Sequence, residues 1–237
     1  MLKAIIWDYD GTLVDTRQKN LNVTRAIISH VTGKPADVFP VLDSVAVYDA
    51  ANMKAPNWRV LYKEEFGLND EQTTYAGSLW TTYQLKDNTA INFFNGINEV
   101  IHSLSFYSHG IVSQNSKQNI TDVLSREGVD EHFKIIIGYE EVSFAMQKPH
   151  PEGLLQCITQ LTQLDDEGII LYIGDHETDA TCAHNANNAL SRKAIYSVGA
   201  FYEKHDHSDS WRIKPDFKAA HPNDILKIAE TLNLQSA

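Results

Sequence analysis

Hydrophobic positions along this chain follow two rhythms, and the change of rhythm marks segments of different structure. Residues 3–7 form a short apolar run, rich in Ile and Trp, that ends at a cluster of aspartates. Such a run predicts a buried strand that opens into a polar loop. From residue 16 to about 92, apolar positions recur at helical spacing and no convincing strand pattern is present. Beyond residue 92, helical spacing and short apolar runs alternate, which indicates a mixed α/β region.

The segment 16–92 reads as a small all-helical domain. Its apolar patterns predict helices near residues 21–31, 38–48, 58–66 and 70–83. Gly33 and Gly67 are the expected stops of the first and third helices. Asn69 followed by Gln72 resembles a capping box, which predicts the start of the fourth.

The rest of the chain predicts parallel βαβ units. Strands are expected near residues 110–113, 135–137, 169–173, 194–198 and 216–219. Helices are expected near residues 97–104, 119–126, 151–161, 178–185 and 225–232. The predicted fold class is therefore α/β: a three-layer, Rossmann-like sandwich with a central parallel sheet. Residues 1–15 and 93–237 form this core, and the small all-helical domain, residues 16–92, is inserted after the first strand.

Composition narrows the range of partners. The formal net charge of −11 disfavours a nucleic-acid polymer, because phosphate backbones require a basic surface. It leaves room for a small phosphorylated ligand, which needs only a local patch of donors and a metal ion. Only two cysteines occur, and no apolar run is long enough to span a bilayer. We therefore expect a cytoplasmic protein that has no membrane partner.

Candidate reactive side chains lie where predicted strands end or in the loops nearby: Asp8, Asp10, Ser113, Lys148, Asp175 and Asp179. Ligands of an open parallel sheet bind beyond the carboxyl ends of its strands, so we expect these side chains to converge. Carboxylates packed together repel one another unless a cation relieves them. Oxygen ligands without nearby cysteines favour Mg²⁺.

The residue types suggest phosphoryl transfer. A carboxylate that attacks phosphorus forms an acyl phosphate and splits one difficult displacement into two easier ones. Asp8, the first residue after the strand, is the candidate nucleophile, and Asp10 is the candidate general acid and base. Mg²⁺ and Lys148 would neutralise the phosphoryl oxygens. The Ser113 hydroxyl and the backbone amides after it are expected just before a helix, where they can bind the same oxygens.

At these residues the chain resembles the haloacid dehalogenase-like hydrolase superfamily, in its phosphoglycolate phosphatase-like branch with a helical cap. The first motif reads Asp-Tyr-Asp-Gly-Thr-Leu-Val-Asp at residues 8–15. The others follow in the family's order at residues 111–113, 148–152 and 174–179. The resemblance covers essentially the whole chain and implies that the helical insertion is a cap.

The resemblance also implies roles for the matching residues. Asp8 would be the nucleophile, and Asp10 the acid and base that also offers its backbone carbonyl to the metal. The implied Mg²⁺ ligands are Asp8, Asp10, Asp175 and Asp179, the last directly or through water. The expected phosphate-binding residues are Ser113, Gln114 and Lys148.

Two departures from the family pattern are visible. An Asn directly after the hydroxyl residue is common, whereas here Gln114 intervenes before Asn115, so the role of Asn115 is open. The residues after Asp175 are also unusual, and they make Glu177 an alternative metal ligand, although a solvated carboxylate is the better interpretation. The polar segment 205–209, with two histidines, is interpreted as a solvated loop.

The leading functional hypothesis is a Mg²⁺-dependent phosphomonoesterase that acts on a small phosphorylated metabolite through an aspartyl-phosphate intermediate. One alternative is a phosphotransferase or phosphomutase on the same scaffold. A second is a non-catalytic phosphate-binding regulatory protein. The sequence leaves the phosphate ester open, as well as whether the protein is a monomer or a homodimer.

Overall fold

The computed structural model describes residues 1–55, 57–162, 168–202 and 206–234. The chain divides into two compact units. One unit, here called the core unit, comprises Met1–Asp15 and Phe93–Ala237, and the other, the helical unit, comprises Thr16–Asn92. Within the described residues, no helix is both long and apolar enough to cross a membrane.

A parallel sheet forms the centre of the core unit. Its strands in the described residues are β1 (Leu2–Trp7), β4 (Ser108–Val112), β5 (Phe133–Ile137), β6 (Ile169–Gly174), β7 (Ile195–Ala200) and β8 (Phe217–Ala219). They lie in the order β5-β4-β1-β6-β7-β8, and every neighbouring pair is parallel. The first strand is therefore central, between β4 and β6. The predicted parallel α/β sandwich is confirmed.

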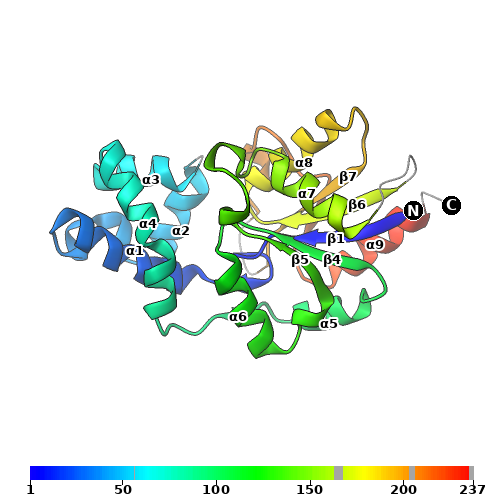
Figure 1. Ribbon diagram of the computed structural model, residues 1–237, viewed down its shortest axis with the longest axis horizontal. Coiled ribbons are helices and arrows are strands. Elements are labelled where there is room, and N and C mark those ends of the chain that lie inside the picture. Colours follow the sequence, from blue (N-terminus) through cyan, green and yellow to red (C-terminus); the bar gives the residue numbers. More distant parts are fainter. Residues whose placement is uncertain (56, 163–167, 203–205, 235–237) are drawn as a thin grey trace. The chain divides into compact units, whose positions relative to one another are not determined.

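Helices cover both faces of this sheet (Figure 1). They are α5 (Ile97–Ser103), α6 (Lys117–Glu127), α7 (Glu152–Leu161), α8 (Glu177–Ala189) and α9 (Asp224–Leu234). Helices α7 and α8 pack on one face, where Cys157 and Cys182 join a buried apolar cluster with Ile6 and Tyr172 of the strands. Helices α5, α6 and α9 lie on the other face. The buried strands thus have apolar side chains on both sides, as parallel sheets require.

The helical unit has a core of its own. Its α-helices in the described residues are α1 (Arg17–Thr32), α2 (Val45–Lys54), α3 (Trp58–Phe66) and α4 (Asp70–Lys86). Gly33 and Gly67 end α1 and α3 in the left-handed conformation, and the Asn69 and Gln72 capping box starts α4, so these predictions are confirmed.

The expectation of one helical pattern over residues 38–48 is wrong. Two short 3-10 helices, η1 (Ala36–Val38) and η2 (Pro40–Leu42), occupy its first half. Helix α2 begins only after Ser44, whose side chain accepts a hydrogen bond from the backbone N–H of Val47. A strand pair of two residues each, β2 (Val14–Asp15) and β3 (Asn92–Phe93), was not predicted, because such short strands leave no periodic pattern.

Candidate active site

Three neighbouring strands deliver polar residues to one edge of the sheet. Asp8 follows β1, Ser113 follows β4, and Asp175 follows β6. Backbone hydrogen bonds continue past the strand ends: the Asp8 N–H donates to the carbonyl of Ile173 at 2.7 Å, and the Ser113 N–H to that of Ile137 at 3.0 Å. The residues that the sequence placed at strand ends are therefore held by the sheet itself.

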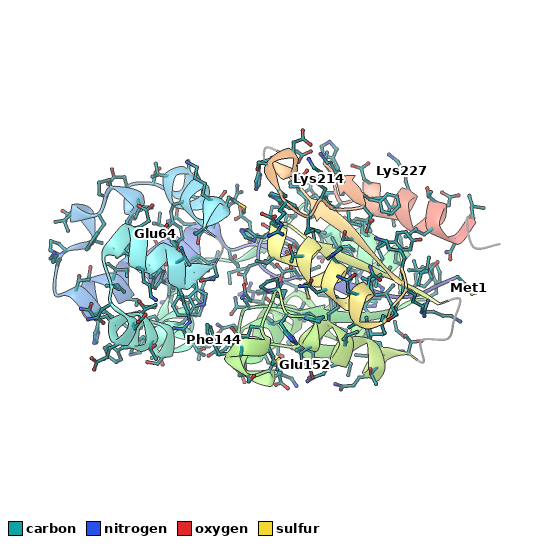
Figure 2. All side chains as sticks on the ribbon, turned by 90° about the horizontal axis from the view of Figure 1, so that it is seen from above. Met1, Glu64, Phe144, Glu152, Lys214 and Lys227 are labelled. Carbon is teal, nitrogen blue, oxygen red and sulfur yellow. The ribbon has the colours of Figure 1, made fainter. Side chains whose placement is uncertain are left out.

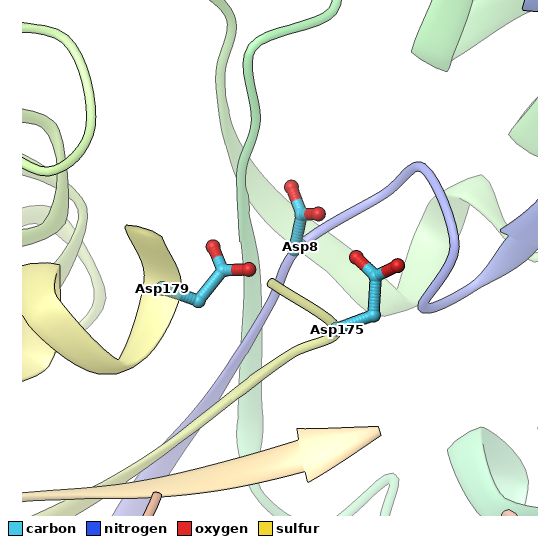
Figure 3. A group of neighbouring side chains, drawn as sticks. All are labelled: Asp8, Asp175 and Asp179. Atoms are coloured by element: carbon cyan, nitrogen blue, oxygen red, sulfur yellow. The ribbon is translucent and has the colours of Figure 1, made fainter. Parts of the chain in front are cut away.

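Asp8, Asp175 and Asp179 form a buried carboxylate cluster (Figure 3). One oxygen from each lies within 4.8 Å of the others. The three residues are only 6%, 6% and 3% exposed. Three carboxylates this close and this far from water repel one another strongly unless cations accompany them. The cluster therefore has the donor set of a site for a hard divalent cation.

Lys148 brings a cationic side chain to this cluster. Its Nζ lies 2.7 Å from Oδ1 of Asp8 and 2.7 Å from Oδ1 of Asp179. Burial alone would lower the pKa of Lys148, but the carboxylates of Asp179 and Asp8 outweigh it and raise that pKa. The lysine is therefore a permanent ammonium that bridges two of the three carboxylates.

The electrostatic balance at Asp8 still favours the protonated acid. Burial raises its pKa most; Lys148 lowers it, and the charges of Asp179 and Asp175 raise it again. The net direction is upward, because burial together with the charges of Asp179 and Asp175 outweighs Lys148. A second source of positive charge is what would ionise Asp8 fully, and a divalent cation fits that requirement.

Asp179 is fixed by groups of the protein on both oxygens. Oδ1 accepts hydrogen bonds from Lys148 and, at 3.0 Å, from the hydroxyl of Tyr172, and Oδ2 accepts from the backbone N–H of His176 at 3.2 Å. Gly174 permits this approach, since a Cβ there would lie 2.2 Å from Cγ of Asp179. Asp179 consequently orients Lys148, whatever it contributes to a metal.

Asp10 lies in the turn that follows Asp8. Gly11 adopts a φ of 74°, which a residue with a side chain rarely takes, and its N–H donates to the carbonyl of Val14. The Asp10 carboxylate is outside the cluster of three and accepts hydrogen bonds from Nδ2 of Asn115 at 3.0 and 3.3 Å. Metal binding by its backbone carbonyl stays a prediction.

Ser113, Gln114 and Lys148 line one pocket of the core unit. The Ser113 hydroxyl accepts from the backbone N–H of Asn115 at 3.1 Å. The helix expected shortly after Ser113 is present: α6 begins at Lys117 with Ser116 as its N-cap. Ser113 therefore lies in a turn before the helix, because the chain needs these residues to leave the sheet.

The segment between β5 and α7 carries Lys148 and closes one side of this pocket. Its exposed face includes Phe144, which is 58% exposed (Figure 2). Side chains of Gln147 and Gln114 tie the segment down, with hydrogen bonds to the carbonyls of Tyr139 at 3.0 Å and of Lys148 at 3.3 Å. Gln114 thus anchors the lysine segment through its side chain; phosphate binding by Gln114 stays a prediction.

Two other candidate groups do not join the site in the described residues. Glu177 accepts hydrogen bonds from the backbone N–H groups of Arg212 at 2.6 Å and Ile213 at 3.3 Å, so it braces a loop. In the polar segment 205–209, Asp206 pairs with Lys218 at 2.8 Å. His205 lies outside the described residues.

Sequence reasoning missed Tyr172 and left Asn115 open. Tyr172 was counted only as part of an apolar strand, although a hydroxyl among Ile and Leu residues is a sign that a buried polar partner exists. For Asn115 no sequence signal showed which way its side chain points.

Comparisons with known proteins find similar chains over almost the whole length of this one. A model of the family described as haloacid dehalogenase-like hydrolase matches residues 5–190. Pyrophosphatase PpaX of Listeria innocua is 25% identical over 230 residues, which cover 96% of each chain. N-acetylmuramic acid 6-phosphate phosphatase of Pseudomonas aeruginosa is 24% identical, with 97% of this chain and 95% of that protein covered. A crystal structure from Haemophilus somnus, described as a predicted phosphoglycolate phosphatase, shares the fold with a TM-score of 0.73, 20% identity and coverage of 96% and 98%.

Proposed function

Because the chain belongs to the haloacid dehalogenase-like hydrolase family, we propose that it is a Mg²⁺-dependent phosphomonoesterase in which Asp8 forms an aspartyl phosphate. The observation that carries this proposal is the buried Asp8 carboxylate, paired with Lys148 and lying within 4.8 Å of Asp175 and Asp179. An ion pair with Lys148 needs only one carboxylate, whereas three buried carboxylates meet at this site.

The residues present fit a magnesium ion. Asp8 and Asp175 offer carboxylate oxygens, the Asp10 backbone carbonyl is the further ligand that we propose, and Asp179 supports the site through Lys148 or directly. Three carboxylates within 4.8 Å of one another offer the hard oxygen donors that a divalent cation such as Mg²⁺ prefers. When bound, the ion supplies positive charge to the phosphoryl oxygens and keeps Asp8 ionised.

The first chemical step transfers the phosphoryl group to the protein. An oxygen of Asp8 attacks phosphorus while the bond from phosphorus to the leaving oxygen breaks. Asp10 donates its proton to the leaving oxygen, so that an alcohol departs rather than an alkoxide. Lys148 and the Ser113 hydroxyl hold phosphoryl oxygens during this transfer.

The second step restores the enzyme. Asp10, now ionised, removes a proton from water, and the water oxygen attacks the phosphorus of the aspartyl phosphate. The bond between phosphorus and Asp8 breaks, inorganic phosphate is released, and Asp10 carries the proton for the next cycle. Because one carboxyl group acts in both steps, its position decides both rates.

The substrate that we propose is a small phosphorylated metabolite. The relatives named above are called a pyrophosphatase and an N-acetylmuramic acid 6-phosphate phosphatase, names that share a phosphate group on a small molecule. We further propose that the helical unit, Thr16–Asn92, acts as a cap that selects the leaving group, because the phosphate chemistry uses residues of the core unit alone.

The test is phosphate release from p-nitrophenyl phosphate and a panel of metabolite phosphates, with Mg²⁺ and with chelator, for the protein and for Asp8→Asn. We expect Mg²⁺-dependent turnover that the variant loses by a factor of about 10³ or more. Phosphorylated Asp8 without release to water would instead identify a phosphotransferase or phosphomutase. If no phosphate is hydrolysed and none phosphorylates Asp8, the proposal is overturned and the protein is instead a phosphate-binding protein.

A further inference from the structure

Asn115 is buried beside the site, and all its polar groups are engaged. It is 3% exposed. Its Nδ2 donates to both carboxylate oxygens of Asp10, at 3.0 and 3.3 Å. Its Oδ1 accepts from the backbone N–H of Ser116 at 2.8 Å and from Nδ2 of Asn119 at 3.1 Å.

The orientation of the Asn115 amide follows from these partners. A backbone N–H such as that of Ser116 can only donate, so the side-chain atom that meets it must be the oxygen. The NH₂ group is then on the side of Asp10. The contact between Asn115 and Asp10 is therefore an N–H donor against a carboxylate, and the amide cannot be flipped to present its oxygen to Asp10.

The backbone of Asn115 joins further parts of the site. Its N–H donates to the Ser113 hydroxyl at 3.1 Å, and its carbonyl accepts from the N–H of Tyr139 at 3.1 Å. Gly138 allows this packing, because a Cβ there would lie 3.0 Å from the carbonyl oxygen of Asn115. Asn115 is thus held in place by the segment that carries the site's lysine.

A purely structural role at the start of α6 does not account for the Nδ2 contact. Ser116 already caps that helix, because its side chain accepts from the backbone N–H of Asn119 at 3.2 Å. The Oδ1 of Asn115 adds to this cap. Its NH₂ group, in contrast, donates to the Asp10 carboxylate and not to the helix.

We propose that Asn115 is a positioning residue for the general acid: its NH₂ group fixes the Asp10 carboxyl in the orientation that protonates the leaving oxygen. This inference rests on the proposed function, which makes Asp10 the acid. In the protonated acid the carbonyl oxygen of Asp10 keeps the hydrogen bond from Asn115, and the other oxygen then carries its proton toward the leaving group. Small misplacements of a proton donor are costly in rate.

The experiment measures kcat/KM for substituted phenyl phosphates of graded leaving-group acidity. The value of kcat/KM reports the steps up to departure of the leaving group, so it changes when proton donation by Asp10 is impaired. An activated leaving group such as p-nitrophenolate scarcely needs a proton, whereas phenolate does. For Asn115→Ala and Asn115→Asp we expect losses of about tenfold or more with phenyl phosphate and of less than about threefold with p-nitrophenyl phosphate.

The variants Asn115→Asp and Asn187→Ala guard against a folding artefact. Asn115→Asp keeps the shape and the acceptor for Ser116 and Asn119, replaces the donor by an acceptor, and so sets a second carboxyl group against that of Asp10. Asn187 also uses its whole side chain, with hydrogen bonds to the backbone of Ile195 and Ala194 at 2.8 Å, but it lies near the C-terminal end of α8, on a different helix from the one that Asn115 precedes. Asn187→Ala is expected to lower stability without changing the dependence on the leaving group.

The Asp10→Asn variant separates this inference from the proposed function. It should show the steepest dependence on the leaving group, and adding Asn115→Ala to it should cost little more, because both act on one proton transfer. If Asp10→Asn steepens the dependence and the Asn115 variants do not, the inference is wrong and the function stands. If Asp10→Asn leaves it unchanged, the acid role itself fails.

Discussion

At the scale of single residues, the hydroxyl of Tyr172 is a buried donor with one acceptor, Oδ1 of Asp179, at 3.0 Å. We expect Tyr172→Phe to lower the free energy of unfolding by about 1–3 kcal/mol, because the hydrogen bond is buried and its acceptor is charged. It should also lower kcat, since Asp179 then orients Lys148 less firmly. Urea denaturation and steady-state kinetics measure the two effects.

Tyr196→Phe is the matched control for this prediction. Tyr196 lies on β7, half-buried, with Lys193 5.0 Å from its ring centroid. Removing its hydroxyl should leave kcat unchanged. Equal kinetic effects of the two variants would show that the hydroxyl of Tyr172 has no special link to the site.

His109 predicts a pH dependence of stability. Trp7 Nε1–H can only donate, so Nδ1 of His109 accepts it at 3.0 Å and Nε2–H donates to the carbonyl of Leu104 at 2.9 Å. Burial, with smaller contributions from His132 and Lys134, lowers the pKa of His109 below its ordinary 6.5, although the bond to Leu104 opposes this.

The sign follows from proton linkage. The unfolded chain binds a proton at His109 near pH 6.5 and the folded chain only at lower pH, so stability falls as pH drops below about 6.5, by up to about 1.4 kcal/mol per pH unit from this group. His109→Gln can still accept and donate but does not titrate. Urea denaturation between pH 7.5 and 5.5 should show a smaller loss in this variant; an identical loss would exclude His109 as the cause.

Residues at strand ends could be predicted from the sequence, whereas their supporting contacts could not. Asp8 and Asp175 follow apolar runs, and a parallel sheet brings such ends together whatever surrounds them. The links from Tyr172 to Asp179 and from Asn115 to Asp10 depend on which way side chains point across separate elements. One sequence alone carries no signal for that.

At the scale of elements, local chemistry decided which boundaries were predictable. Helix α4 begins where Asn69 and Gln72 form a reciprocal cap, and these two residue types three positions apart can be recognised in the sequence. Residues 38–48 have apolar spacing that suits a helix, but Pro40 lacks an N–H and Ser44 caps a later start. Apolar spacing there reflects burial of Val41 and Leu42 in 3-10 turns.

The packing of α7 on β4 gives a prediction at this scale. A Cβ at Gly110 would lie 2.5 Å from Sγ of Cys157 and 2.8 Å from Cδ1 of Leu161. We expect Gly110→Ala to destabilise the protein by about 1–3 kcal/mol through overpacking. Cys157→Ala should cost less in the Gly110→Ala background than alone, because it removes one clashing atom. Chemical denaturation of the four proteins measures this coupling.

Gly128→Ala is a control in which destabilisation comes from backbone strain and not from overpacking. Gly128 ends α6 at a φ of 68°, and nothing lies within 4 Å of a Cβ placed there. Its replacement strains the backbone by about 1 kcal/mol and should show no coupling to Cys157. Full additivity of Gly110→Ala and Cys157→Ala would mean that helix α7 shifts to absorb the methyl group.

At the scale of the whole molecule, the proposed function depends on charged residues that are far apart in the sequence. Asp8, Lys148 and Asp179 lie 140 and 31 residues from one another and meet only in the folded core unit. The parallel sheet was predictable because strand and helix patterns alternate over many residues. The substrate was not, because leaving-group selection is a property of surfaces and not of motifs.

A divalent cation should therefore stabilise the entire fold. Only the folded chain assembles the proposed Mg²⁺ site, so we expect a concentration of about 100 times Kd to add roughly 2.7 kcal/mol to the free energy of unfolding. Thermal denaturation with Mg²⁺ and with chelator measures this shift. Asp175→Asn should remove most of it, whereas Glu64→Gln, which removes an exposed carboxylate on α3 (Figure 2), should keep it. An equal shift in both variants would place the ion elsewhere. Loss of the shift in Asp175→Asn alone would tie the stabilisation to the cluster, because both variants remove one negative charge.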